Sequence, residues 1–336
     1  MPNISRRNII AGTGAAIAAT TIASTSALGA APSGKPLAGK SFLVTGASSG
    51  FGRVGAEHYA RQGARVFATM RNLPRPEADE LQILAKDEKL DIHVLPLDVL
   101  SDSKVQAAVA EAERINGGPI DVLVNNAGIN IHGPVEVQDI EATQLSFDTN
   151  VYGYLRLFRA VLPGMRKRKS GLIVNVSSQQ GRVVAPNGGV YSATKFAVES
   201  MCEQLAYELV PHGIDVVIIQ PGGYPTGIGK SRARLTGALF DRASEDQKAG
   251  YPAAVAAVKP APAPAGGGMS RVPSNPLDIP KAIAGAAALP AGKRPLRIAV
   301  HPGNKPQLAI NRVSQETQIA WLGEGPDGVW VKAVYD

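Results

Sequence analysis

The chain has 336 residues, 44% hydrophobic and 19% charged, with a formal net charge of +7; this suits one large folded domain with a tail. Its only cysteine, Cys202, excludes an intrachain disulfide, and we expect it to be a core residue rather than a nucleophile. The histidines lack metal-ligand spacing and the basic residues lack interleaved aromatics, so we predict neither a metal site nor nucleic-acid binding.

The first thirty residues differ in kind from the rest. Arg6 and Arg7 precede a run of Ala, Ile, Thr and Gly without any acid, and small residues follow at 27–31. This layout is typical of a secretory signal, and the paired arginines indicate the twin-arginine route. We therefore predict a signal peptide at 1–30 and export to the periplasm by the twin-arginine machinery. The alternatives are a frayed apolar terminus or an uncleaved anchor helix, and the protein is cytoplasmic if the leader does not function.

Apolar strands alternate with helical patterns from about residue 41 to residue 220. This alternation is typical of an α/β fold with a doubly wound parallel sheet. We predict a single Rossmann-like domain over residues 38–304. The expected strands are 41–46, 65–70, 91–97, 120–125, 171–177 and 214–220, with a seventh at 296–300 on the edge of the sheet.

A glycine-rich turn follows the first strand and opens a helix that continues through residues 56–62. Glycines there let the backbone turn tightly and approach a pyrophosphate, which the free N–H groups of the helix N-terminus attract. A glycine trio between a strand and a helix is better support for a dinucleotide site than the trio alone. The predicted cofactor contacts in this turn are Gly46, Ser48, Ser49, Gly50 and Gly52.

The second strand ends at Met70 and Arg71, where folds that prefer NAD place an acid for the ribose hydroxyls. A carboxylate would repel a 2′-phosphate, whereas a guanidinium binds it in a fork. We therefore favour NADP(H) over NAD(H) as the cofactor. The alternative is that Arg71 only caps the surface.

Tyr191 and Lys195 lie four residues apart in a predicted helix, which puts a phenol and an ammonium on one face. A nearby positive charge lowers the pKa of a phenol, so that it can act as an acid or base near neutral pH. Alone the pair is weak support for catalysis, because the same spacing arises by chance on a surface helix.

The wider context makes the pair specific. The glycine turn is followed in order by Asn125-Asn-Ala-Gly128, by Asn150 in a predicted helix, by Ser178 thirteen residues before Tyr191, and by Pro221-Gly-Gly-Tyr-Pro-Thr226. With these motifs the chain resembles the short-chain dehydrogenase/reductase family, densely over 38–230 and loosely over 275–305.

This resemblance implies the catalytic roles. Tyr191 would exchange the proton, and Lys195 would lower the pKa of Tyr191 and bond the nicotinamide ribose. Ser178 would bond the substrate oxygen, while Ser177 points to the other face of the strand. Asn150 would hold a water that links Lys195 to solvent. Another interpretation, compatible with the first, is that Asn150 satisfies backbone groups at a helix kink.

The resemblance also implies further cofactor contacts and the oligomeric state. Asp98 would lie near the adenine, and Asn125 and Gly128 would line the adenosine side. Thr226, with Pro221 and Gly222, would lie at the nicotinamide. A homodimer or homotetramer is expected, often formed through the helix that carries Tyr191.

Two segments near the C-terminus are less regular. Residues 252–276 are rich in Pro, Ala and Gly, so we predict a flexible loop there, in the region that forms the substrate lid in the family. The tail 305–336 contains Trp321 and Trp330 and is expected to pack on the domain or on a partner.

We therefore predict an NADP(H)-dependent oxidoreductase that interconverts a small-molecule alcohol and its ketone or aldehyde by hydride transfer. One alternative is a sugar-nucleotide epimerase or dehydratase, which shares the Tyr-x-x-x-Lys pair but usually has a different glycine spacing. A second alternative is a non-catalytic nucleotide-binding protein, although all four catalytic positions are filled.

Overall fold

The computed structural model describes residues 34–258 and 273–335. The predicted leader at 1–30 lies outside the described residues, as does most of the segment predicted to be flexible. From Lys35 onward the chain forms one compact unit.

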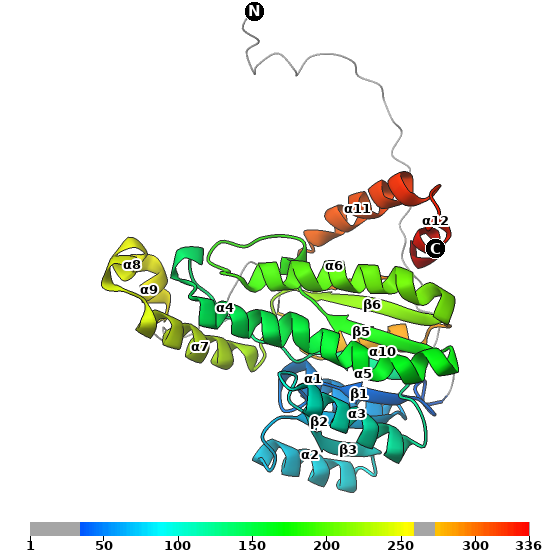
Figure 1. Ribbon diagram of the computed structural model, residues 1–336. Helices are drawn as coiled ribbons and strands as arrows, with labels where there is room; N and C mark the ends of the chain where they lie inside the picture. The colour runs from blue at the N-terminus through cyan, green and yellow to red at the C-terminus, as the bar shows by residue number, and fades with distance from the viewer. Residues whose placement is uncertain (1–33, 259–272, 336) are drawn as a thin grey trace, which may run out of the picture. The chain divides into compact units, whose positions relative to one another are not determined.

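This unit is built on a seven-stranded parallel sheet with the strand order β3-β2-β1-β4-β5-β6-β7, so the predicted Rossmann-like fold is confirmed (Figure 1). Each observed strand agrees with its prediction to within two residues at either end, and β2 agrees at both ends. The strands are β1 Ser41–Val44, β2 Arg65–Met70, β3 Ile92–Pro96, β4 Val122–Asn125, β5 Gly171–Val176, β6 Ile214–Pro221 and β7 Arg297–Val300.

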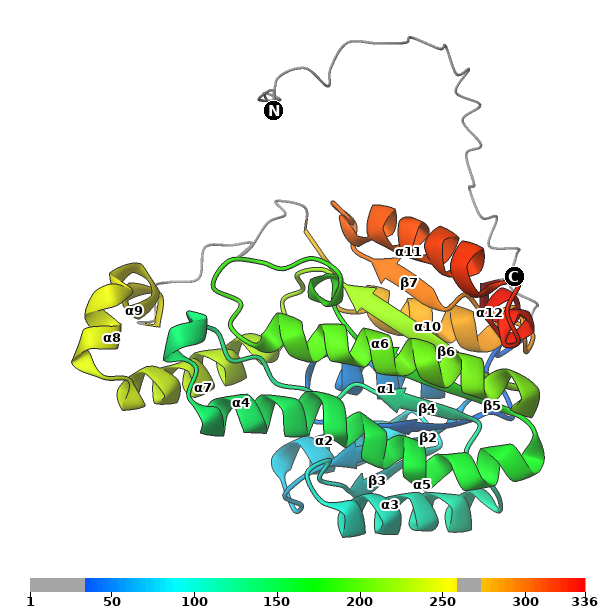
Figure 2. The same cartoon turned by 45° about the horizontal axis from the view of Figure 1, so that its top comes forward.

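Helices connect the strands and cover both faces of the sheet (Figure 2). The helices up to β6 are α1 Gly50–Arg61, α2 Pro76–Asp87, α3 Asp102–Asn116, α4 Ile140–Phe147, α5 Gly153–Arg168 and α6 Tyr191–Leu209. The later helices are α7 Ile228–Arg242, α8 Glu245–Gly250, α9 Pro252–Val258, α10 Asp278–Ala288, α11 Gln307–Leu322 and α12 Gly328–Tyr335. Short turns of 3₁₀ or π geometry are η1 Val135–Val137, η2 Asp148–Tyr152, η3 Gln179–Gly181 and η4 Val210–His212.

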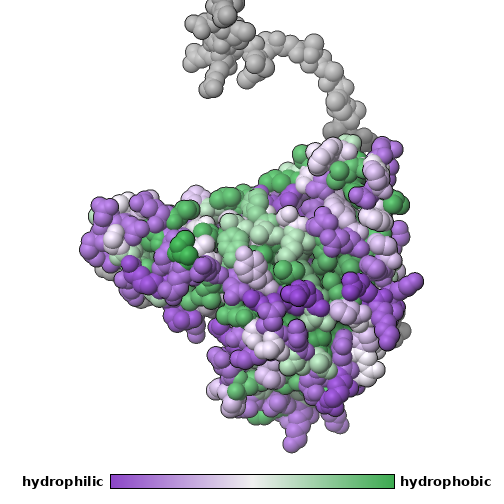
Figure 3. Space-filling view, viewed as in Figure 1, coloured by the Kyte–Doolittle hydropathy of each residue, from purple (hydrophilic) through white to green (hydrophobic). Residues whose placement is uncertain are grey.

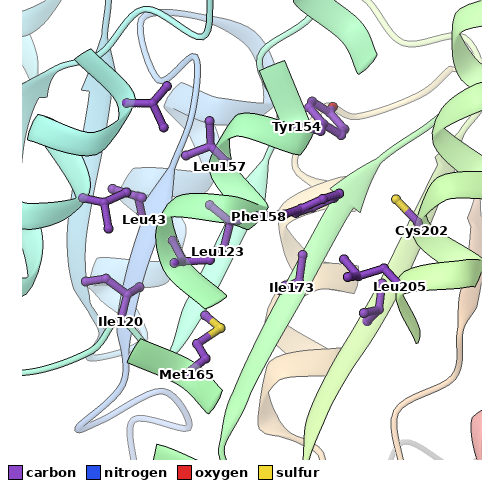
Figure 4. Close-up of a cluster of buried hydrophobic side chains, with 14 of the residues drawn as sticks. Leu43, Ile120, Leu123, Tyr154, Leu157, Phe158, Met165, Ile173, Cys202 and Leu205 are labelled. Atoms are coloured by element: carbon purple, nitrogen blue, oxygen red, sulfur yellow. The ribbon is translucent and has the colours of Figure 1, made fainter. Parts of the chain in front are cut away.

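The core has two layers because successive residues of a strand point to opposite faces of the sheet. Leu43 and Leu123 pack with residues of α3, α5 and α6, including Phe158 and the buried Cys202 (Figure 4). Val44 and Val124 pack on the other face with residues of α1, α2 and α10. Cys202 is thus a core residue, as predicted.

The strand order reverses between β1 and β4, which are neighbours in the sheet although β2 and β3 separate them in the chain. The loops after two such strands run to opposite sides and leave a crevice at their carboxyl ends, where ligands bind in open α/β sheets. The glycine turn follows β1 directly, and the Asn125–Gly128 segment begins at the last residue of β4.

The C-terminal segments are more regular than the composition suggested. Pro252–Val258 forms helix α9, so the prediction of a flexible loop over 252–276 is wrong for its first part. Packing of α9 against α7 and α8 accounts for the order, because an Ala-rich segment becomes helical once a neighbouring surface covers it. The tail forms α11 and α12, of which α12 packs on α6. In the ranges that the structure describes, no helix has the length and apolarity needed to cross a bilayer.

Candidate active site

The glycine turn has the geometry of a phosphate cradle. Gly46 and Gly50 have φ angles of +70° and +56°, in the left-handed region that side chains disfavour. A Cβ on Gly52 would lie 2.4 Å from the carbonyl oxygen of Gly46. The turn therefore requires glycine at these positions and leaves bare backbone at the N-terminus of α1, which fits a dinucleotide pyrophosphate.

The loop after β4 supports this turn from below. Thr45 Oγ1 accepts hydrogen bonds from the backbone N–H groups of Asn126 (2.9 Å) and Ala127 (3.0 Å), and Asn126 Nδ2 donates to the Thr45 carbonyl at 2.9 Å. Asn125 is completely buried and donates to Asn175 Oδ1 at 2.9 Å. The structure therefore differs from the prediction that the Asn125 side chain lines the adenosine side. Asn125 holds β4 to β5, whereas Gly128 is exposed in the loop after β4, and its place on the adenosine side stays a prediction.

The loop after β6 closes against the glycine turn. A Cβ on Gly50 would lie 3.4 Å from Thr226 Cβ, and a Cβ on Gly227 would lie 3.3 Å from Ser49 Oγ. Two sets of predicted cofactor residues, more than 170 positions apart in sequence, thus meet at one edge of the sheet. Ser48 is half-buried in the glycine turn. Pro221 is buried at the end of β6, and a Cβ on Gly222 would meet the ring of His301.

Arg71 lies exposed directly after β2. Its basic neighbours are engaged: Arg53 Nε pairs with Glu57 at 2.7 Å and Arg75 Nε with Glu77 at 2.8 Å. Among residues 34–258 and 273–335, the Arg71 side chain makes no hydrogen bond or ion pair. Asp98 follows β3 and accepts a hydrogen bond from the N–H of Leu100, which orders the neighbouring loop.

Tyr191, Lys195 and Ser178 come together below the carboxyl end of β5. Tyr191 begins α6 and is 9% exposed, while Lys195, one turn later, is 4% exposed. Lys195 Nζ lies 5.8 Å from the centre of the Tyr191 ring and donates to the carbonyl oxygen of Val176 at 2.8 Å. Ser178 Oγ accepts from the N–H of Gln180 at 3.1 Å, and the interaction of Ser178 with Tyr191 acts to lower the pKa of that phenol.

Burial dominates the pKa values of this pair. It raises the pKa of Tyr191 to about 12, and the bond to Ser178 opposes this only in part. Burial lowers the pKa of Lys195 to about 8, while its interactions with Cys202 and Glu199 act in the opposite direction. The Tyr191 pKa is therefore raised rather than lowered, because burial disfavours the charged phenolate, and the expected effect of Lys195 on it stays a prediction.

Asn150 joins the loop after β4 to α6. Its amide makes two bonds with Ile129, accepting from the N–H at 2.8 Å and donating to the carbonyl at 2.9 Å, and it donates to Thr194 Oγ1 at 3.1 Å. It lies in the π-helical turn η2 between α4 and α5. The predicted kink with satisfied backbone groups is therefore present. Asn150 Oδ1 and Lys195 Nζ both lie within 4 Å of where a Cβ on Gly128 would stand.

A separate apolar cluster lies next to these groups. Ile129 and Ile131, just after the Asn125–Gly128 segment, pack with Leu239 and Phe240 of α7. Residues of α9, including Val255, pack on the same cluster. The described part of the predicted lid is thus hydrophobic where it contacts the loop beside Tyr191 and Lys195.

Several contributors were not predicted from the sequence. Tyr154 of α5 donates to the carbonyl of Val176 at 3.0 Å, and Glu199 and Glu203 continue the buried row of Tyr191 and Lys195 along α6. The four-residue spacing of that row was a signal that could have revealed both glutamates. Asn126, whose side chain bonds the backbone of the glycine turn, was also not singled out. In the parts of the chain that the structure describes, no group of three His, Cys, Asp or Glu residues is arranged to hold a metal ion.

Comparison with known proteins agrees with this geometry. Residues 40–235 match the family described as short chain dehydrogenase. The chain is 38% identical to 3-ketodihydrosphingosine reductase of Bacteroides thetaiotaomicron over 60% of this chain and 71% of that protein. It is 39% identical to bovine (Bos taurus) retinol dehydrogenase 8 over 62% of this chain and 66% of that protein. A short-chain dehydrogenase from Streptomyces avermitilis superimposes with a TM-score of 0.62 at 29% identity, covering 84% of this chain and 96% of that structure.

Proposed function

The chain belongs to the short-chain dehydrogenase family and is an oxidoreductase of that family, and from this premise we propose that it interconverts an alcohol and a ketone or aldehyde with NADP(H), using Tyr191 as general acid and base. The observation that carries the proposal is the buried group of Tyr191, Lys195 and Ser178 beside the glycine turn. Family membership does not favour the epimerase or dehydratase alternative, nor a non-catalytic nucleotide-binding protein.

The protein's own groups supply positioning and proton transfer. A bound nicotinamide would supply or accept the hydride, held by the glycine turn, Lys195 and the Thr226 loop. Ser178 Oγ donates to the substrate oxygen and fixes it beside the phenol. Tyr191 gives its proton to that oxygen in reduction and takes it back in oxidation. Lys195 then stabilises the phenolate electrostatically, and Asn150 keeps the neighbouring loop and α6 in register.

Tyr191 enters carbonyl reduction in its protonated form. With this pKa raised to about 12, the phenol holds its proton near neutral pH and is ready to donate it. Alcohol oxidation needs the phenolate, which Lys195 and the positive charge of an oxidised nicotinamide would together have to stabilise.

The preference for NADP(H) is supported by the charges after β2. Arg53 and Arg75 are paired with carboxylates, which leaves Arg71 to bind a 2′-phosphate in a fork. The buried Met70 ends the strand without a carboxylate that would bind a ribose diol.

The substrate we propose is a hydrophobic carbonyl compound. The apolar cluster of Ile129, Ile131, Leu239 and Phe240 lies between the α7–α9 segment and the loop that Asn150 anchors. The names of two relatives, a 3-ketodihydrosphingosine reductase and a retinol dehydrogenase, point to the same class. An apolar lid excludes water from the reacting carbonyl and binds the body of such a substrate.

We also propose twin-arginine export of the folded enzyme, on the strength of Arg6, Arg7 and the acid-free run after them.

We further propose a homodimer or homotetramer, which exposed apolar side chains on α5 and α6 support. Leu155 and Phe196 are 42% and 41% exposed, and Figure 3 shows hydrophobic residues across the face over α6. Light scattering on the mature protein tests this assembly.

The decisive experiment is a reduction screen on the mature protein with long-chain 3-keto compounds, retinal and steroid ketones. NADPH and NADH consumption is followed by absorbance, with Tyr191→Phe as the blank. NADPH oxidation that depends on both the ketone and Tyr191 supports the proposal. Equal activity in the Tyr191→Phe protein would contradict it.

A further inference from the structure

The catalytic face of α6 continues beyond Lys195 into two buried carboxylates. Tyr191, Lys195, Glu199 and Glu203 follow one another at intervals of four residues. Side chains at this spacing lie one above the other along a helix. Glu199 is 2% exposed and Glu203 is 7% exposed. Buried carboxylates are costly unless they are paired, so each of them needs a partner.

Arg297 of the edge strand β7 is the shared partner. Its Nε lies 2.8 Å from Glu199 Oε2, and its Nη2 lies 2.5 Å from Glu203 Oε2. The guanidinium is itself almost completely buried, with its side chain 6% exposed. One planar group thus bridges two successive turns of the catalytic helix, a fork that a lysine could not reproduce.

The second oxygen of Glu199 is also engaged. Glu199 Oε1 accepts from Gln220 Nε2 at 3.0 Å, and Gln220 directly precedes the Pro221–Thr226 loop. Gln220 Oε1 in turn accepts from Asn311 Nδ2 of α11 at 2.7 Å. Both carboxylate oxygens of Glu199 therefore have partners other than Lys195, whose ammonium donates to the Val176 carbonyl.

Glu203 ties the same network to the C-terminus. It accepts hydrogen bonds from the hydroxyl groups of Tyr207, at 2.8 Å, and of Tyr335 in α12. The titratable or charged groups that face the two carboxylates are Lys195, Cys202 and Tyr207 on α6, Arg182 after η3, Arg297 on β7 and Tyr335 on α12. Those facing Lys195 are Tyr191, Cys202 and Glu199 on its own helix and Tyr154 on α5.

We propose that Arg297 is a positioning residue for the reaction, which holds the Glu199 carboxylate away from Lys195 and keeps the ammonium on the Val176 carbonyl and available to the cofactor. This inference rests on the proposed role of Lys195. Without the Arg297 guanidinium, Glu199 is a buried carboxylate whose remaining neighbouring cations are Arg182 and Lys195, the latter one helical turn away. It would then pair with Lys195 and draw the ammonium from the site.

The proposal predicts opposite pH shifts for two substitutions. Carbonyl reduction needs Lys195 charged, so kcat falls as Lys195 loses its proton. Arg297→Met leaves Glu199 without its main counterion, so the carboxylate attracts the Lys195 ammonium more strongly and raises the pKa of Lys195. The alkaline limb of the pH–kcat profile, along which kcat falls, then moves up by about half to one pH unit. Glu199→Gln removes a negative charge and moves the limb down. In the double variant, Arg297→Met has no further effect on the limb, because the carboxylate through which it acts is absent.

The experiment measures kcat and KM against pH for wild type, Arg297→Met, Arg297→Lys, Glu199→Gln and the double variant. We expect Arg297→Met to lower kcat roughly tenfold at neutral pH, with a smaller change in KM. Arg297→Lys keeps the charge and should hold the limb at its wild-type position. Arg294→Met is the matched control, because it breaks the partly buried pair with Asp215, at 2.5 Å, without touching Glu199.

A second measurement does not depend on turnover. NADPH affinity is titrated by fluorescence against pH, with Lys195→Met identifying the limb that Lys195 controls. Opposite shifts in Arg297→Met and Glu199→Gln support the proposal in either measurement. Shifts of the alkaline limb in the same direction in Arg297→Met and Glu199→Gln, or no shift in either variant when both fold, overturn the proposal. If Arg297→Met does not fold, a downward shift in Glu199→Gln together with a wild-type limb in Arg297→Lys supports the proposal, and an unmoved limb in Glu199→Gln overturns it. Absence of turnover in wild type would count against the proposed function, while the NADPH titration would still test the positioning role of Arg297.

Discussion

Lys195 and Tyr154 donate hydrogen bonds to the same acceptor, the carbonyl oxygen of Val176, at 2.8 Å and 3.0 Å. Val176 ends β5, two residues before Ser178, so this oxygen ties Lys195 to the strand that leads into Ser178. The ammonium is thereby placed by the backbone of the sheet rather than by a flexible partner, which pre-organises it for the cofactor.

Tyr154→Phe should leave the enzyme folded and active. The Val176 carbonyl keeps Lys195 as a donor, so no buried acceptor is left unpaired, and the loss is that of one hydrogen bond, about 1 kcal/mol of unfolding free energy. Urea unfolding and kcat measure the two effects. A loss of activity as large as that of a catalytic substitution would show that Tyr154 takes part in the chemistry.

Tyr191→Phe should lower kcat by roughly a thousandfold or more, because general acid catalysis and orientation of the oxygen are both lost. NADPH affinity should stay within about threefold of wild type, since the phenol oxygen is aimed at the substrate. Steady-state kinetics measures the change in kcat, and fluorescence titration measures the NADPH affinity. Tyr154→Phe is the matched control, as it removes a second buried phenol near the same lysine, and retained activity in Tyr191→Phe would contradict the assigned role.

Lys195 should make stability rise with pH above neutrality. The ordinary lysine pKa of 10.5 falls to about 8 in the folded chain, so between these values the unfolded chain binds more protons. Stability then increases with pH in this window, and the cost of burying the charge disappears. Relative to Lys195→Met, wild type should gain about 2–3 kcal/mol between pH 7 and pH 10. Urea unfolding of both proteins across this range measures the difference, and a constant difference would argue against the lowered pKa.

Arg71→Asp should weaken NADPH far more than NADH. A lost charge-assisted bond, with repulsion added, changes the ratio of kcat/KM for the two cofactors by roughly a hundredfold. Arg75→Ala is the control, because Arg75 is already paired with Glu77. Equal losses for NADPH and NADH would refute a contact between Arg71 and the 2′-phosphate.

Residues 1–35 fused to a folded reporter should direct it to the periplasm, because the twin-arginine pathway reads the paired arginines and accepts folded cargo. Cell fractionation measures the location of the reporter. The control is Arg6→Lys/Arg7→Lys, which keeps the charge but removes the recognised pair. Export that survives this change, or a reporter that stays in the cytoplasm, would count against the leader.

The fold was predictable because its signals are local. Apolar strands that alternate with helices, such as 65–70 and 171–177, need only a dozen neighbouring residues to be recognised. The prediction for 252–276 failed in its first part because composition describes what a segment prefers alone. Helix α9 forms against α7 and α8, and that packing was not visible in the sequence.

The sequence by itself determined the chemical groups of the site: the glycines of the turn, and Tyr191 and Lys195 on one helix face. Their spacing is set by strand and helix geometry, which the chain follows wherever it folds. Only the tertiary structure decided which groups have partners and which are desolvated. Arg297 and Glu199, 98 residues apart, meet only once β7 joins the sheet, and the pKa of Tyr191 rises to about 12 because the folded chain removes water from the phenol.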